Sequence, residues 1–177
     1  GFNTRLWRPG KGAHMALFPN LNPNDPVWRK LLRDVRFRRA MSLAINRHEL
    51  NRVIYFGLAL EAQNTVLPDS PLFREKYQKN WTQFDIAEAN RLLDSLGLEK
   101  RDSRGIRLLP DGRPLDIIVE STGESTEEAD VLELIQDSWR LVGAKLHTKP
   151  TQREVMRNRI YAGETVMAIS SGMDNGL

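Results

Sequence analysis

The runs LDIIVE (115–120), AKLHT (144–148) and TVMAI (165–169) decide the fold class, because helical patterns separate them. Those patterns are TEEADVLELIQDSWRLV (126–142) and QREVMRNRIY (152–161). The first of them places apolar side chains on one side of a helix and acidic side chains on the other. The order strand, helix, strand, helix, strand favours an α/β fold with a parallel or mixed sheet and flanking helices.

Upstream of this unit, polar residues stand where helices are expected to begin. The expected N-caps are Asp25, Asp34, Asn46 and Asp85. Asn46 is followed three residues later by Glu49, which is a capping box, and glycines at 57 and 97 end two of the helices. The helices that Asp34 and Asn46 open abut almost without a linker, so we expect a corner between them.

Two hairpins are expected outside the helices. Residues 2–7 and 13–18 flank a turn-rich linker, and residues 106–109 and 115–120 flank a Pro-Asp-Gly turn. Residues 59–79 are expected to form a loop.

The composition excludes several classes of protein. The chain has 177 residues, 40% hydrophobic and 28% charged, with no Cys and a formal net charge of +3. Without Cys there is no disulfide scaffold, thiolate zinc site or cysteine nucleophile. No apolar run approaches the roughly 18 residues of a membrane span. The length suits one large domain.

A basic cluster lies on the first two helices. Its members, within eleven residues, are Arg29, Lys30, Arg33, Arg36, Arg38 and Arg39. Guanidinium groups bind phosphates, so one interpretation is a nucleic-acid-binding module on this helix pair. The other interpretation is a solvated face balanced by acids elsewhere, and a net charge of only +3 favours it.

The chain carries no signature of an enzyme. His14, His48 and His147 lack the spacing of metal ligands. Gly-Lys-Gly at 10–12 lacks the rest of a phosphate loop, and no Gly-x-Ser-x-Gly motif occurs. We therefore expect no catalytic residue, no metal and no cofactor.

One acid stands apart at the carboxyl end of the last apolar run. Asp174 lies in the sequence Gly-Met-Asp-Asn-Gly (172–176). Ligands of open α/β sheets gather at the carboxyl ends of strands, where a carboxylate could pair with a ligand ammonium group. The same residues also suit an Asp-Asn-Gly turn.

Residues 34–47, DVRFRRAMSLAINR, resemble the DVRFRxALSLAIxR stretch of the extracellular solute-binding proteins of family 5. These are the oligopeptide, dipeptide and nickel receptors of ATP-binding cassette importers. Further segments resemble the family in the same order, namely 1–4, 57–59, 67–71, 85–98 and 105–115.

The resemblance implies that residues 1–177 are a single lobe of a type II periplasmic-binding-protein-like fold, with a mixed sheet, flanking helices and extra hairpins. It implies a fragment of a two-lobed, monomeric receptor about three times as long, without its partner segments. The parent would be periplasmic, or anchored to the membrane outside the cell. It would capture a peptide-like or other small solute and deliver it to a membrane permease.

The resemblance also implies a binding role for Asp174, which matches the aspartate that pairs with the ligand's α-ammonium group in the family's peptide receptors. Ser171, Met173 and Asn175 would lie beside it. Peptide receptors often carry an aromatic residue, usually Trp, shortly before this aspartate. Here Ser170, Ser171 and Met173 occupy that region, which keeps opines and sugars beside peptides as candidate solutes.

Overall fold

The computed structural model describes residues 3–5 and 10–173. Within these residues, one mixed sheet has the order β1-β4-β2-β3. Its strands are β1 (Ala16–Pro19), β2 (Asp116–Ser121), β3 (Lys145–Pro150) and β4 (Met167–Ser170). Strand β2 runs parallel to both β3 and β4, whereas β1 is antiparallel to β4. The predicted α/β class and the mixed sheet are therefore confirmed.

Four of the helices in the described part of the chain begin at the predicted caps Asp25, Asp34, Asn46 and Asp85. The helices are α1 (Pro26–Arg33), α2 (Val35–Leu43), α3 (Arg47–Ile54), α4 (Glu75–Lys79), α5 (Ile86–Asp94), α6 (Thr126–Arg140) and α7 (Arg153–Tyr161). The carboxylate of Asp25 accepts hydrogen bonds from the backbone of Val27 and Trp28, and Asn46 accepts one from the backbone of Glu49. These contacts satisfy N–H groups that a helix leaves unpaired at its first turn.

Helix α4 corrects the loop expected over residues 59–79. It is a single short turn of five residues without a side-chain cap, so it lacks the signals that mark a helix start. The ammonium of Lys79 lies 2.5 Å from the carboxylate of Glu75, a pair one helical turn apart.

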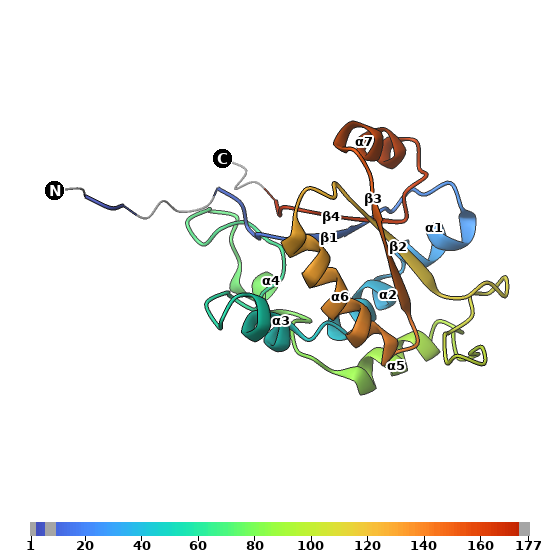
Figure 1. Cartoon of the computed structure of the whole chain (residues 1–177). Coiled ribbons are helices and arrows are strands. Elements are labelled where there is room, and N and C mark those ends of the chain that lie inside the picture. Colours follow the sequence, from blue (N-terminus) through green and yellow to red (C-terminus); the bar gives the residue numbers. More distant parts are fainter. Residues whose placement is uncertain (1–2, 6–9, 174–177) are drawn as a thin grey trace.

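The sheet separates two layers of helices (Figure 1). Helix α7 lies on one face, and α2, α5 and α6 lie on the other. Because side chains alternate along a strand, Ile117 and Val119 of β2 point together and are fully buried in the core. Phe37 of α2 and Trp139 of α6 belong to the same core.

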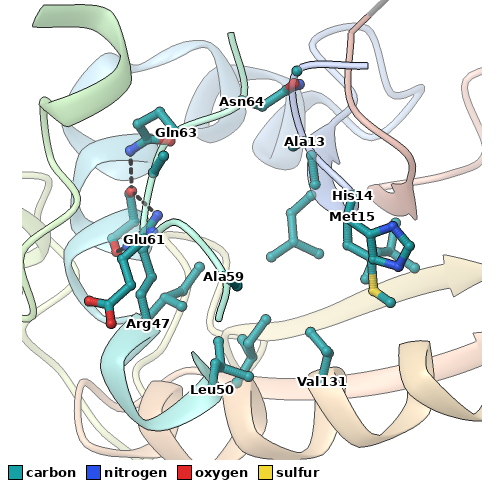
Figure 2. Close-up of a pocket in the computed structure, with 18 of the residues that line it drawn as sticks. Ala13, His14, Met15, Arg47, Leu50, Ala59, Glu61, Gln63, Asn64 and Val131 are labelled. Carbon is teal, nitrogen blue, oxygen red and sulfur yellow. Dashed lines mark hydrogen bonds between the residues drawn. The ribbon is translucent and has the colours of Figure 1, made fainter. Parts of the chain in front are cut away.

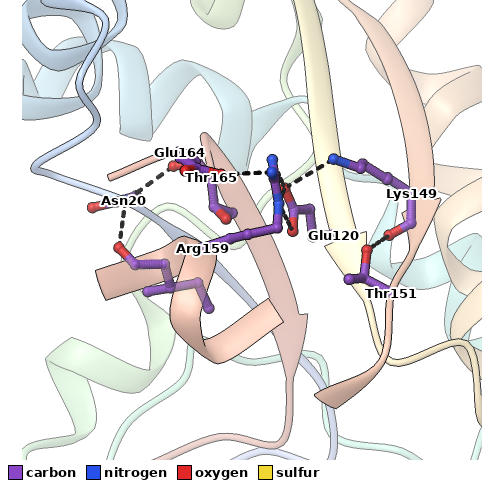
Figure 3. Close-up of polar contacts among 8 residues, drawn as sticks. Asn20, Glu120, Lys149, Thr151, Arg159, Glu164 and Thr165 are labelled. Carbon is purple, nitrogen blue, oxygen red and sulfur yellow. Dashed lines mark hydrogen bonds and ion pairs between the residues drawn. The ribbon is translucent and has the colours of Figure 1, made fainter. Parts of the chain in front are cut away.

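A buried ion pair joins α7 to the sheet (Figure 3). Glu120 is buried on β2, and Arg159 of α7 donates to both of its carboxylate oxygens, at 2.9 Å for the closest contact. The ammonium of Lys149 lies 3.8 Å from the same carboxylate, and Arg159 also donates to Glu164 at 2.7 Å. A buried carboxylate needs such partners, so these contacts explain a buried charged residue near the end of β2.

The first predicted hairpin stays a prediction, and the second forms only in part. Strand β1 pairs with β4, in the register Leu17 with Ile169. The expected partner of β1, residues 2–7, lies partly outside the described residues, because Phe2 and 6–9 are not described. The Pro-Asp-Gly turn does form, closed by Gly112 N–H donating to Leu109 O at 2.9 Å. However, its first arm makes only isolated bridges, because the backbone N–H of Arg107 bonds to Gly143 instead of extending a ladder.

Most of the basic cluster makes contacts within the chain. Side chains of Arg29, Arg33 and Arg38 donate to backbone carbonyl oxygens of residues 23, 21 and 32, and Arg39 lies over the ring of Trp81. These partners are carbonyl oxygens and a ring, not the distant acids that the solvated-face interpretation expected, and they do not support the nucleic-acid alternative. In the part of the chain that the structure describes, no helix is long and apolar enough to cross a membrane.

Candidate functional site

Three segments meet where β4 ends. The backbone N–H of Gly172 donates to Ala13 O, and the N–H of Gly12 donates to Met173 O, both at 2.8 Å. The side-chain oxygen of Asn64 accepts a hydrogen bond from Met173 N–H at 2.9 Å. We call residues 11–13, 64 and 171–173 the strand-exit clamp. It fixes the chain at the residue before Asp174.

Two glycines allow these segments to approach one another. A Cβ on Gly12 would lie 1.4 Å from the carbonyl oxygen of Thr65, and one on Gly172 would lie 2.6 Å from the backbone nitrogen of Ala13. Both distances are far inside van der Waals contact. Gly12, expected only as a turn residue, is therefore required by the packing of the clamp.

The structure places two of the four predicted site residues. Ser171 lies in the clamp, where its hydroxyl accepts a hydrogen bond from the ammonium of Lys11 at 2.8 Å. Met173 is also in the clamp and is 52% exposed, so its side chain faces solvent. Asp174 and Asn175 lie outside the described residues, and their roles stay predictions.

A pocket of about 820 Å³ lies beside the clamp, on the face of the sheet that α2 and α6 cover. Figure 2 shows Leu50 and Val131 on one side of it, with Ala13 and Met15 on another and Arg47 and Gln63 across the open space. The apolar part of its lining includes Met15, Leu17, Leu50, Val131, Ile135 and Ile169. These residues come from β1, α3, α6 and β4 and their flanking segments, so no single stretch of sequence announces the pocket.

The polar wall of the pocket is internally hydrogen-bonded. Arg47 donates to the carbonyl and to the hydroxyl oxygen of Ser42, each at 2.8 Å, and Gln63 donates to the same hydroxyl oxygen at 2.7 Å. Burial lowers the pKa of Arg47 to about 10, and the carboxylate of Glu61 acts in the opposite direction. The guanidinium is still charged at neutral pH, but its donors are already hydrogen-bonded to Ser42.

Three polar side chains meet near the pocket. His14 Nε2 lies 3.2 Å from the carboxylate of Glu127, and Tyr55 donates its hydroxyl proton to that carboxylate. Burial raises the pKa of Tyr55, and the nearby carboxylate adds to this rise. Burial also acts to raise the pKa of Glu127, but hydrogen bonds from Tyr55 and His14 outweigh it and lower that pKa. His14 and Tyr55 line the pocket, so this cluster forms part of its polar edge.

Sequence reasoning missed the clamp partners, the polar wall and the cluster around Glu127. His14 and Glu127 are 113 residues apart, and Asn64 and Met173 are 109 apart, so only folding brings them together. The helices that Asp and Asn cap could be recognised from neighbouring residues in the sequence. The contacts of the clamp, the polar wall and the Glu127 cluster have no such local signal.

Among residues 3–5 and 10–173, no group of three or more His, Cys, Asp and Glu side chains could hold a metal ion. The three histidines each face a different carboxylate: Glu127 for His14, Glu61 for His48 and Asp116 for His147. They therefore belong to three separate contacts with carboxylates.

The chain resembles known binding proteins over nearly its whole length. The dipeptide-binding protein of Escherichia coli is 30% identical over 171 residues, which cover 94% of this chain and 30% of that protein. The solved structure of an oligopeptide-binding protein OppA matches with a TM-score of 0.87 and 35% identity, covering 95% of this chain and 26% of that one.

A more distant structure shares the fold alone. NikA from Brucella suis, in complex with Fe(III)-EDTA, matches with a TM-score of 0.77 and 22% identity, covering 94% of this chain and 32% of that one. The chain thus spans about a third or less of the length of these three relatives. The model of bacterial extracellular solute-binding proteins, family 5 middle, matches residues 4–176. This chain belongs to family 5 of the bacterial extracellular solute-binding proteins.

Proposed function

We propose that residues 1–177 form one lobe of a two-lobed receptor that captures a small solute for an ATP-binding cassette importer. The family match over residues 4–176 is the observation that carries this proposal. The names of the relatives, a dipeptide-binding and an oligopeptide-binding protein, favour a peptide as the solute. The receptor acts by binding and release, without catalysis or a cofactor, and passes the solute to a membrane permease.

The location of the clamp supports the carboxyl end of β4 as the ligand-facing edge of the lobe. Ligands of α/β sheets bind outside the carboxyl ends of the strands. The clamp holds Met173 by its backbone at this edge, so the residue that follows starts from a fixed point. We propose that the Asp174 carboxylate pairs there with the α-ammonium group of the peptide.

Calorimetry of the intact protein that contains this lobe tests the function. Tripeptides, opines and oligosaccharides are titrated in turn, and saturable binding of a peptide is the expected result. If none of these solutes binds, the proposal of a solute receptor for them is wrong.

The role of Asp174 has its own test. Asp174→Ala is expected to weaken binding of Ala-Ala-Ala at least tenfold, because a hydrogen bond to a charged group contributes about 1.5–3 kcal/mol. Asp137→Ala is the matched control, since Asp137 is exposed on α6 and pairs only loosely with Arg140 at 3.4 Å. N-acetyl-Ala-Ala-Ala, which lacks the ammonium group, should bind both variants equally. A loss below about twofold in Asp174→Ala would refute the pairing.

We also propose that the receptor is a monomer outside the cytoplasm, either periplasmic or anchored to the membrane. Cell fractionation with antibody detection tests the location, and light scattering of the purified protein tests the monomer. Recovery in the cytoplasmic fraction, or a stable dimer, would contradict the respective statement.

A further inference from the structure

We infer that the pocket beside the strand-exit clamp receives a large, uncharged, apolar group of the captured solute, such as an aromatic or branched aliphatic side chain. This inference rests on the proposed function, because it names the class of solute that the same site selects. Three features of the pocket carry it, namely its continuity with the clamp, its size and apolar lining, and the state of its polar groups.

The pocket and the clamp share residues. Gly12, Ala13 and Asn64 make the hydrogen bonds that hold Gly172 and Met173, and the same three residues line the pocket. A solute held at the end of β4 therefore lies next to the pocket. Its side chain can enter while its backbone stays at the clamp.

The size and lining of the pocket suit an apolar group. Its volume of about 820 Å³ falls within the range of about 300–1,000 Å³ that is usual for small-molecule sites. Leu50 and Val131 form one side of it, and Ile135 and Ile169 continue the apolar lining toward the core. Each apolar Å² that a solute buries there contributes to binding through the hydrophobic effect.

The polar groups of the pocket do not call for a charged solute group. Donors of Arg47 are bound to the carbonyl and hydroxyl of Ser42, and a weaker contact at 3.3 Å goes to Thr82 O. The Glu127 carboxylate is bound by Tyr55 and His14. Glu61 also lines the pocket, and one of its carboxylate oxygens already lies 3.2 Å from His48 Nδ1 and accepts a hydrogen bond from the Asn51 amide at 3.2 Å. A lysine side chain would lose its hydration, meet the positive charge of Arg47 and compete with these partners for Glu61. The charged groups of the pocket therefore favour a neutral group on the solute.

The test uses three tripeptides and the intact protein. Ala-Trp-Ala, Ala-Ala-Ala and Ala-Lys-Ala are titrated by calorimetry. We expect Ala-Trp-Ala to bind at least tenfold more tightly than Ala-Ala-Ala, and Ala-Lys-Ala to bind no more tightly than Ala-Ala-Ala. Equal affinities, or a preference for Ala-Lys-Ala, would overturn the inference.

A pocket-filling variant locates the preference. In Leu50→Trp the new indole occupies the pocket from α3, so the ratio of the Ala-Trp-Ala and Ala-Ala-Ala affinities should fall toward one. Val53→Trp, on the same helix at a position that is 58% exposed and outside the lining, should keep the ratio. Because the readout is a ratio measured on one variant, partial unfolding does not mimic the result. A ratio that survives Leu50→Trp would place the preference elsewhere and overturn the inference.

Free indole separates this inference from the proposed function. Saturable binding of indole to the intact protein, measured by saturation-transfer NMR, is expected and should be lost in Leu50→Trp. If no peptide binds but indole does so in this way, peptide capture is wrong and the apolar pocket stands. If peptides bind without a preference and indole does not bind, the pocket inference fails and the receptor function stands. If neither probe binds, both fail.

Discussion

Replacing Arg107 by methionine should destabilise the folded chain by about 3 kcal/mol, an expectation that follows from its contacts. Arg107 is only 1% exposed. Its guanidinium donates to Val142 O at 2.8 Å, to the Asn90 side-chain oxygen at 2.7 Å, to the Asp94 carboxylate at 2.6 Å and to Leu98 O. One side chain thus ties the 101–109 segment to α5 and to the end of α6.

The magnitude follows from what the substitution leaves behind. Methionine fills most of the volume of the arginine stem, so little cavity forms. The carbonyl groups of Leu98 and Val142 lose a charged donor in a buried place, and each unsatisfied group costs about 1–3 kcal/mol. Asp94 is 47% exposed on its side chain, so water can replace its partner and this pair adds at most about 1 kcal/mol. The sum is about 3 kcal/mol, at the lower end of the range for breaking a buried ion pair.

Urea unfolding followed by far-ultraviolet circular dichroism measures the effect. With a denaturant slope of about 2 kcal/mol/M, the unfolding midpoint should fall by about 1.5 M. Arg104→Met is the matched control, because Arg104 is in the same segment, 64% exposed and paired only with Asp102. It should cost less than about 1 kcal/mol. If both variants lowered the midpoint equally, the buried guanidinium would not be the tie that its contacts indicate.

Three further predictions concern other parts of the structure. The folded-state pKa of Glu127 is lowered by hydrogen bonds from Tyr55 and His14, so its stabilising contribution is present above its unfolded pKa of about 4.3 and is lost as the pH falls through the folded value. The stability difference between wild type and Glu127→Gln, measured in urea melts, should therefore shrink as the pH falls below about 4.3. Glu120→Gln removes a buried carboxylate with two cationic neighbours and should cost about 3 kcal/mol in thermal unfolding, whereas Glu164→Gln, at an exposed pair, should cost less than about 1 kcal/mol. Gly12→Ala should weaken solute binding by about tenfold because its Cβ collides with the clamp backbone, while Gly10→Ala, with open space around it, should bind as wild type in calorimetry.

The helix starts could be predicted because their signals are local. The side chain of Asp25 accepts hydrogen bonds from N–H groups two and three residues further along the chain, and the side chain of Asn46 accepts one from the N–H group three residues further along. Each cap and its partner are therefore close neighbours in the sequence. The parallel strands could be predicted for a similar reason, since β2 and β3 are each followed by a crossover helix, α6 and α7. By contrast, the pairing of β1 with β4 joins Leu17 to Ile169, and no pattern near either residue specifies the partner.

The same distinction separates the two parts of the candidate site. A general rule about the ends of α/β strands directed attention to Asp174 without any knowledge of its neighbours. No comparable rule pointed to the pocket. Its walls come from segments that are far apart in the sequence, and the residues of each segment alternate between core and surface. Ser170, Ser171 and Met173 show why this matters for the choice of solute. They occupy the region in which the family's peptide receptors often carry an aromatic residue, which by itself would weaken the case for peptides. The pocket lies beside the same clamp and offers apolar surface from Leu50 and Val131 instead. On the pocket inference, an apolar side chain of the solute therefore finds its contacts in the pocket and needs no aromatic residue before Asp174.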